Sequence, residues 1–205
     1  MSGAPARLIV HSDYLCPWCF NAAVRLQAIE EEFGDAVEIT WRSFLLRPAP
    51  EARSMEQFRA YTRSWLRPAA EPDAGTFRVW STDEGPPSHS LPPHLVAKAA
   101  ATLGRDAFAR VHAALWRAYF TESRDVTRRA TLRRLWDEAG LPAEAFARAE
   151  SDEIVQATLA EHDAAVRGGI TGVPTVMAEG QDVAIPGALP LATYRRWVRH
   201  LRGMT

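Results

Sequence analysis

Residues 7–19 read Arg7-Leu-Ile-Val-His-Ser-Asp-Tyr-Leu-Cys-Pro-Trp-Cys19, a short apolar run followed by a Cys-Pro-Trp-Cys segment. The apolar run predicts a β-strand that ends at Ser12. Pro17 suits the first turn of a helix, and Gly34 suits its end. Between them, apolar residues recur at three- or four-residue intervals, at Cys19, Ala22, Leu26, Ile29 and Phe33. The stretch therefore predicts a strand, a loop and a helix that begins at the two cysteines.

Strand patterns flank this helix and recur at the other end of the chain. Val37, Ile39 and Trp41 alternate with polar residues, which predicts a second strand and completes a βαβ unit within the first 43 residues. Residues 175–178 and 183–185 are strand candidates separated by the turn-forming residues 179–182, so we expect them to pair as a hairpin. An amphipathic helix is predicted at about 190–202. The tail therefore predicts a ββα unit.

Residues 44–169 lie between these two units and are too many for a loop. Their periodicity predicts helices at about 92–103, 105–121, 129–139, 142–149 and 152–167, after a proline-rich start and irregular structure from Pro68 to Pro93. A βαβ half and a ββα half that share one sheet make a thioredoxin-like fold. We therefore predict an α/β fold, with a discontinuous thioredoxin-like domain (1–43 and 170–205) and an inserted helical domain or cap (44–169).

The composition is that of an ordinary globular protein. Of the 205 residues, 47% are hydrophobic and 24% are charged, and the formal net charge is −1. This balance argues against a disordered chain, and it gives no overall field that favours nucleic acid or an anionic membrane. The sequence contains no run of 18 apolar residues, and the N-terminus does not resemble a secretion signal. We therefore expect a cytoplasmic protein with neither nucleic-acid nor membrane partners.

Cys16 and Cys19 are the only cysteines in the chain. Cys16 lies where the free N–H groups and the positive end of the helix dipole favour a thiolate over a thiol. Cys19, one turn later on the apolar stripe, should be more buried. This asymmetry predicts that Cys16 attacks a substrate disulfide and that Cys19 resolves the mixed disulfide. In reverse, the oxidised pair accepts electrons from a substrate dithiol.

A non-catalytic role is the alternative. The two cysteines could be core residues, or they could bind zinc in a module that holds metal or peptide. His89 and His94 have the spacing of the histidine half of a zinc site, but they lie far from the cysteines in sequence. We therefore expect no metal ligands.

The segment Ser12-Asp-Tyr-Leu-Cys-Pro-Trp-Cys19 resembles the active-site segment of the DsbA-type thioredoxin-fold oxidoreductases, in particular their FrnE-like branch. Gly169-Ile-Thr-Gly-Val-Pro-Thr-Val176 is similar to the second signature of this family, whose proline is cis and faces the cysteines. The resemblance is specific at both ends of the chain and weak across 44–165. It implies thiol–disulfide exchange with no bound cofactor, on protein or small-molecule thiols and disulfides, with glutathione as a candidate co-substrate.

The resemblance also implies a cis bond between Val173 and Pro174 and a substrate-binding surface made of Pro17, Trp18, Val173 and Pro174. The backbone of Val173 is placed to pair with an extended substrate as an added strand. The alternative is that Pro174 only begins a strand. Strongly oxidising relatives have His where this chain has Trp18, so we expect a redox potential less oxidising than the DsbA value of about −120 mV.

A different enzyme class has a similar fold. The 2-hydroxychromene-2-carboxylate isomerases and the kappa-class glutathione transferases also carry a helical insertion, use glutathione, and usually have Ser at the first active position. Both active positions are Cys here. This difference favours the oxidoreductase, with the glutathione-dependent isomerase or transferase as the alternative.

Overall fold

The computed structural model describes residues 4–181 and 183–204. Residues 1–3 of the predicted N-terminal segment, Asp182 of the predicted turn and Thr205 lie outside the described residues. The strands are β1 (Ala6–Ser12), β2 (Val37–Ser43), β3 (Thr175–Ala178) and β4 (Ala184–Pro186). The α-helices are α1 (Pro17–Phe33), α2 (Met55–Thr62), α3 (Leu66–Ala69), α4 (Leu91–Ala101), α5 (Arg105–Phe120), α6 (Arg129–Glu138), α7 (Asp152–Arg167) and α8 (Leu191–Leu201). Short 3₁₀ helices span Gly34–Ala36, Arg63–Trp65 and Ala143–Glu150.

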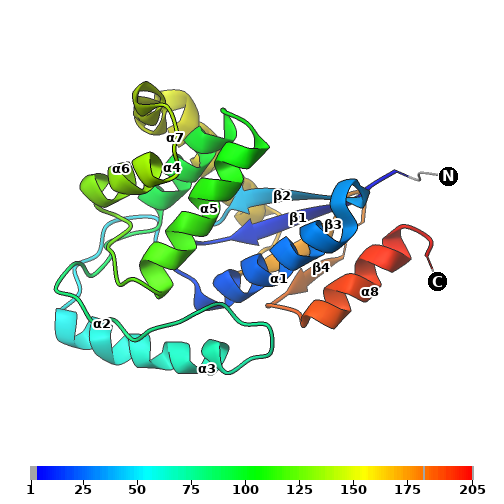
Figure 1. Cartoon of the computed structure of the whole chain (residues 1–205), viewed down its shortest axis with the longest axis horizontal. Helices are drawn as coiled ribbons and strands as arrows, with labels where there is room; N and C mark the ends of the chain where they lie inside the picture. Colours follow the sequence, from blue (N-terminus) through cyan, green and yellow to red (C-terminus); the bar gives the residue numbers. More distant parts are fainter. Residues whose placement is uncertain (1–3, 182, 205) are drawn as a thin grey trace.

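The four strands form one mixed sheet in the order β2-β1-β3-β4 (Figure 1). β1 and β2 are parallel and are connected through α1, whereas β3 is antiparallel to both β1 and β4. Val10 of β1 lies opposite Trp41 on one side and Val176 on the other. The prediction of an α/β fold with βαβ and ββα halves in one sheet is therefore confirmed.

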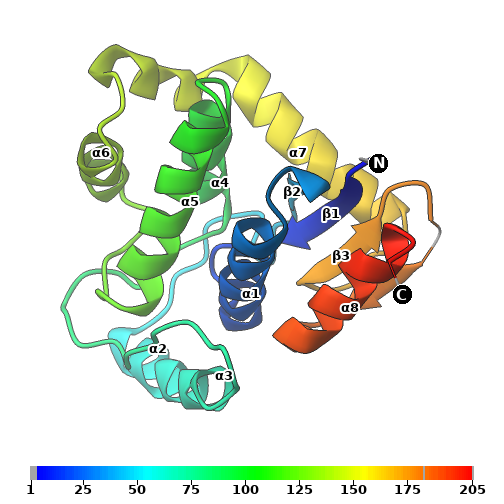
Figure 2. The same ribbon diagram turned by 45° about the vertical axis from the view of Figure 1, so that its right-hand side comes forward.

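Helices α1 and α8 cover one face of this sheet, and α7 lies on the other (Figure 2). The predicted stripe of α1 is confirmed over most of its length, because Cys19, Ala22, Leu26 and Ile29 are each 0% exposed, whereas Phe33 at its end is half-buried. Gly34 ends the helix with a φ of +52°, a conformation that favours glycine. The core on this face is built from apolar residues of β1, β3, α1 and α8: Leu8, Val10, Leu26, Ile29, Val176, Tyr194 and Val198.

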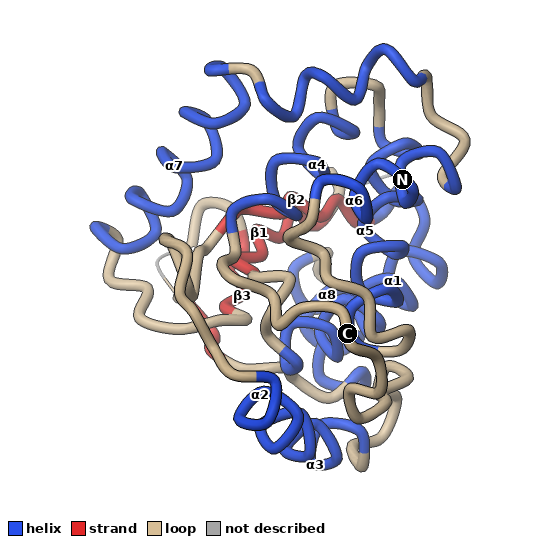
Figure 3. Tube along the Cα trace, turned by 90° about the vertical axis from the view of Figure 1, so that its left-hand side faces the viewer, coloured by secondary structure: helices blue, strands red, loops and turns tan. Residues whose placement is uncertain are grey.

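The remaining helices lie between β2 and β3 in sequence. Figure 3 shows α2 and α3 together, away from α4 and α7, with loops running between the two groups. A second buried cluster joins these helices to the start of α1, and it contains Cys16, Cys19, Phe20, Trp65, Trp80, Trp116, Tyr119 and Phe120. The inserted helices therefore pack directly on the cysteine segment. That 44–169 forms a separate domain stays a prediction.

Two parts of the insertion differ from the sequence prediction. The structure has α2, a 3₁₀ turn and α3 over 55–69, where we predicted no helix. The apolar residues of this segment recur at helical intervals and pack on the second buried cluster, at Met55, Phe58, Tyr61 and Trp65, so the sequence prediction was wrong here. The segment at 142–149, predicted as helix, is a 3₁₀ helix over Ala143–Glu150.

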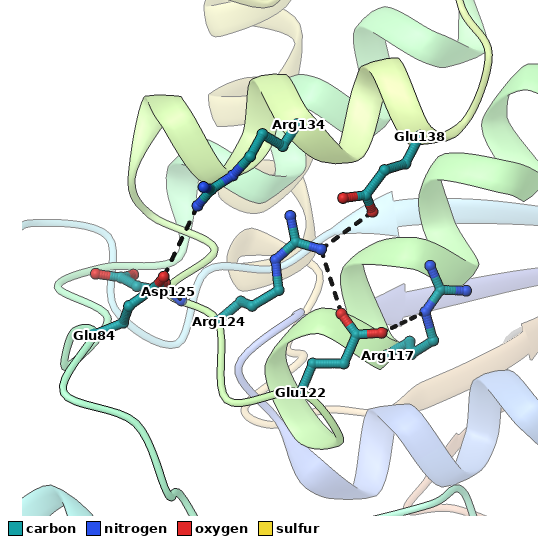
Figure 4. Close-up of polar contacts among 7 residues, drawn as sticks. All are labelled: Glu84, Arg117, Glu122, Arg124, Asp125, Arg134 and Glu138. Atoms are coloured by element: carbon teal, nitrogen blue, oxygen red, sulfur yellow. Dashed lines mark hydrogen bonds and ion pairs between the residues drawn. The ribbon is translucent and has the colours of Figure 1, made fainter.

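Ion pairs hold the connection between α5 and α6 (Figure 4). Arg124 donates to Glu122 at 3.3 Å and to Glu138 at 3.1 Å, and Arg134 lies 3.8 Å from Glu84. Glu138 and Arg134 are exposed, and exposed pairs contribute about 0–1 kcal/mol each. The network therefore fixes the path of this loop more than it stabilises the fold.

Candidate active site at the start of α1

Asp13 anchors the loop between β1 and α1. Its side chain is fully buried, and its Oδ1 and Oδ2 accept the backbone N–H groups of Leu15 at 2.7 Å and Leu46 at 2.6 Å. Its carbonyl accepts the N–H of Cys16 at 3.0 Å. Burial raises the pKa of Asp13, against the opposing effect of hydrogen bonds from Ser90 and from the two backbone N–H groups. Asp13 therefore fixes the loop that presents Cys16.

Cys16 is the N-cap residue of α1. Its backbone is extended, and its Sγ accepts the N–H of Cys19 at 3.3 Å. The sulfur thus occupies the position that a capping side-chain oxygen usually takes, at the positive end of the helix dipole. The first turn of α1 contains no acidic residue that would oppose a negative charge there. This geometry favours a thiolate at Cys16.

Both cysteines are buried, so the predicted difference in their exposure is small. Cys19 is 0% exposed, and Cys16 is 4% exposed. Burial raises the pKa of the Cys19 thiol well above its ordinary range, and the neighbouring Cys16 raises it further. Both cysteines are free thiols in the structure. Cys19 therefore stays protonated at neutral pH, while Cys16 caps α1.

The turn before β3 contacts the first cysteine. The Val173–Pro174 peptide bond is cis, and the Cys16 Sγ donates to the carbonyl oxygen of Val173 at 3.4 Å. Pro174 is buried, and its own carbonyl accepts the N–H of Gly187 at 2.7 Å. Cys16 and Val173, which lie far apart in sequence, are thus brought into contact.

The first turn of α1 carries the other two predicted substrate-binding residues. Pro17 is half-buried, and the side chain of Trp18 is 36% exposed. Trp18 is one of the few large apolar side chains on the surface. Pro17 and Trp18 are the first two residues of α1, directly after Cys16. Their contact with substrate stays a prediction.

A hydrogen-bonded aromatic group behind the loop was missed by the sequence analysis. The indole N–H of Trp116 donates to Nε2 of His112 at 3.1 Å, and His112 Nδ1 lies 2.7 Å from the Tyr14 hydroxyl. Because an indole only donates, Nε2 is unprotonated and Nδ1 carries the proton. Burial lowers the pKa of His112 to about 3. A neutral His112 on α5 is therefore hydrogen-bonded to Tyr14. The sequence analysis missed this pair because the two residues are 98 positions apart.

The two histidines considered for zinc make other contacts. His94 packs edge-on against Tyr14, with ring centroids 4.9 Å apart, and His89 Nδ1 lies 2.8 Å from the hydroxyl of Ser88. Within 4–181 and 183–204, no three His, Cys, Asp or Glu residues are grouped so that they could hold a metal ion. Over the same residues, no helix has the length and apolar character needed to cross a membrane.

Known proteins resemble this chain in sequence and in fold. The chain is 28% identical over 197 residues to the uncharacterized protein YwbO of Bacillus subtilis, covering 87% of this chain and 88% of that protein. A candidate protein disulfide isomerase from Nitrosomonas europaea has a similar structure, with a TM-score of 0.79 and 21% identity over 96% of this chain and 95% of the other. The cytosolic disulfide reductase DsbM from Pseudomonas aeruginosa, also solved with GSH, has a TM-score of 0.72 and 23% identity over the same shares of the two chains.

The alternative enzyme class shares the fold as well. A 2-hydroxychromene-2-carboxylate isomerase has a TM-score of 0.66 and 16% identity, over 97% of this chain and 99% of that chain. Structural likeness at such identities shows a common fold and no common activity. The family itself is shown by a sequence match to the DSBA-like thioredoxin domain over residues 7–198, which includes both cysteines and the Val173–Pro174 turn. The chain belongs to the DSBA-like thioredoxin domain family.

Proposed function

We propose that this protein is a thiol–disulfide oxidoreductase that exchanges disulfides through Cys16 and Cys19. One observation carries the proposal: the Cys16 sulfur caps α1 and accepts the N–H of Cys19 at 3.3 Å. A sulfur anion is stabilised at such a position, and a second thiol lies one helical turn away. Family membership supports oxidoreductase activity, and the roles of the two cysteines are our proposal.

The reaction follows from the unequal cysteines. The Cys16 thiolate attacks one sulfur of a substrate disulfide, so that a mixed disulfide forms and the other substrate sulfur leaves as a thiolate. Cys19 loses its proton and attacks Cys16 Sγ, which closes the Cys16–Cys19 disulfide and releases the second substrate thiol. The substrate disulfide gains two electrons, and the protein dithiol loses two. The reverse sequence oxidises a substrate dithiol.

A peptide substrate would align on the turn before β3. Val173 is half-buried, and no acceptor among the described residues lies within hydrogen-bond distance of its N–H. A free backbone N–H next to the reactive sulfur can pair with an extended chain, as in an added strand. We propose that Val173 and Pro174 form one wall of the substrate site and that Pro17 and Trp18 form the other.

The co-substrate and the compartment are part of the same proposal. DsbM is a cytosolic disulfide reductase that has been solved with GSH, which supports glutathione as co-substrate and the cytoplasm as the place of action here. We propose protein or small-molecule thiols and disulfides as substrates, with no bound cofactor. Assignment to the FrnE-like branch stays a prediction.

Trapping the mixed disulfide tests the proposal. After incubation with glutathione disulfide, Cys19→Ala should retain glutathione on Cys16, because the resolving thiol is absent, and Cys16→Ala should retain far less. Intact-mass measurement before and after reduction reports the adduct. Equal trapping by both variants would contradict the assigned roles. Failure of the wild-type pair to equilibrate with any glutathione buffer would contradict the activity itself.

A further inference from the structure

A cavity lies between α1, α5 and the edge strand β2. Its volume is about 390 Å³, which is within the range of pockets that hold small molecules. Its lining begins one helical turn after Cys16, at Phe20, and among the described residues it includes neither cysteine. The cavity is therefore separate from the thiol site, and the proposed exchange reaction does not use it.

Aromatic rings from three elements form the inner wall of this cavity. Trp41 of β2 and Phe108 of α5 are half-buried, and Phe20 and Trp116 behind them are buried and stack with ring centroids 5.8 Å apart. His112 stacks on Phe108 at 4.9 Å, and burial lowers its pKa to about 3, so this ring is neutral. The faces of aromatic rings attract cations as well as flat apolar groups. The inner wall therefore suits an aromatic ligand that carries a positive charge.

The rim of the cavity is acidic. Glu30 and Glu31 of α1 and Asp106 of α5 line it, against one basic residue, Arg105. Arg105 pairs with Glu30 at 2.8 Å, so its charge is already compensated. Glu31 accepts a hydrogen bond from the neutral amide of Gln27 at 2.9 Å. Within the described parts of the chain, no basic nitrogen lies within 4 Å of the carboxylates of Glu31 and Asp106, so both charges at the rim lack a cationic partner.

The stability of α1 does not explain Glu31. Glu30, Glu31 and Glu32 lie together in the last turn of this helix, which has no basic residue, and the negative end of the helix dipole disfavours carboxylates there. Glu32 is compensated by Arg195 of α8 at 2.6 Å, and Glu30 by Arg105. Among the described residues, Glu31 has no such partner, and it faces the cavity rim instead. A cation bound there would relieve both the dipole effect and the repulsion among the three carboxylates.

A smaller space adjoins the inner wall. It has a volume of about 60 Å³, shares Trp41, Phe108 and His112 with the cavity, and is also lined by His94. The His94 side chain is 5% exposed, and its Nε2 is buried without a hydrogen-bond partner among the described residues. A buried polar atom without a partner is costly. The two spaces together thus contain an unsatisfied ring nitrogen as well as two uncompensated charges, which a bound ligand would satisfy.

We propose that this cavity binds a small aromatic cation, a protonated arylalkylamine, with its ring against Trp41 and Phe108 and its ammonium group at the acidic rim. The charge of the rim selects this class of ligand. An aromatic carboxylate of the same shape would be repelled by Glu31 and Asp106, and a neutral analogue would gain only the apolar contacts. Binding involves no covalent step and does not depend on the exchange reaction at Cys16.

Three indoles of similar size test the proposal by isothermal titration calorimetry at neutral pH: cationic tryptamine, neutral indole-3-ethanol and anionic indole-3-propionate. Tryptamine should bind about tenfold or more tightly than indole-3-propionate, with indole-3-ethanol between them. Glu31→Gln should weaken tryptamine about threefold, the effect of one exposed charge pair, and should leave indole-3-ethanol unchanged. The control Glu56→Gln, at an exposed glutamate on α2 away from the cavity lining, should bind all three as the wild type does.

A cavity-filling variant locates the site. Ala113 is an exposed residue of α5 that lines the cavity, so Ala113→Phe places a ring in the space and should weaken tryptamine about tenfold or more, with the urea midpoint checking that the fold is kept. Cys16→Ala should bind tryptamine as the wild type does, which separates this inference from the proposed function. Equal affinity for tryptamine and indole-3-propionate, tryptamine binding that Ala113→Phe leaves unchanged, or equal losses in Glu31→Gln and Glu56→Gln would overturn the inference.

Discussion

Arg25 is a buried arginine on α1 whose replacement should sharply destabilise the protein. Its side chain is 1% exposed, and its Nη1 donates to the carbonyls of Ala188 at 3.0 Å and Leu189 at 3.1 Å. Its Nη2 donates to the carbonyl of Pro72 at 2.7 Å, while Glu71 lies 3.8 Å away and is more exposed. The guanidinium thus joins α1 to the segment before α8 and to the loop after α3.

The magnitude follows from these three hydrogen bonds. Each bond from a charged donor contributes roughly 1.5–3 kcal/mol, and Arg25→Met leaves three carbonyls without that donor. Part of this loss is recovered, because the carbonyls can take up water and a buried charge is removed. We therefore expect a loss of about 3–5 kcal/mol in the free energy of unfolding, with the apolar stem of the side chain largely kept.

Urea denaturation measures this change. The Arg25→Met midpoint should fall with an unchanged m-value, and the melting temperature should fall by roughly 10 °C for a protein of this size. Arg196→Met, at an exposed arginine on α8, is the control and should stay within about 0.5 kcal/mol of wild type. A loss below about 1 kcal/mol for Arg25→Met would refute the idea that this side chain holds the two segments together.

Three further predictions concern pH, the active-site helix and a close contact. Burial lowers the pKa of both His94 and His112 to about 3, so the unfolded chain binds more protons below about pH 6.5, and the free energy of unfolding should fall by up to about 1.4 kcal/mol per histidine per pH unit. Urea denaturation between pH 6.5 and pH 5 measures this slope, and a flat profile would argue against neutral buried rings. Trp18→His adds a hydrogen-bond donor near the thiolate and should make the redox potential roughly 30–60 mV more oxidising in glutathione buffers; an unchanged potential would show that position 18 does not act on the sulfur. Gly75→Ala should cost about 1–3 kcal/mol in urea denaturation, because its Cβ would lie 2.4 Å from the ring of Phe20, and unchanged stability would mean that the ring moves aside.

Local patterns predicted most of the elements that position the site. The stripe on α1, the alternation in β2 and the glycine at 34 each depend on neighbours in sequence, and the structure places them within a residue or two of the prediction. α2 was missed although Met55, Phe58 and Tyr61 recur at three-residue intervals along it. A signal was present, since Ser54 caps this helix by accepting the N–H of Gln57 at 3.2 Å.

Contacts across the chain escaped the sequence analysis. Nothing near His112 in sequence indicates that it holds Tyr14, and nothing near Arg53 indicates that it lies over Tyr61. Such pairs depend on how the insertion packs on the cysteine segment, which hydrophobic periodicity does not encode. Val173 was placed beside Cys16 only through a family resemblance. The sequence therefore identified the two cysteines of the site, whereas the residues that pack around them could be identified only from the structure.

The central claim is that the Cys16 sulfur is held as a thiolate at the start of α1 while Cys19 stays protonated. Alkylation of the reduced protein with iodoacetamide across a range of pH, with each modified cysteine identified by peptide mass spectrometry, tests this claim directly. Modification should fall on Cys16 and should persist to a pH at which free cysteine, titrating at about 8.5, has largely stopped reacting. Modification of Cys19 first, or a profile for Cys16 that matches free cysteine, would contradict the account.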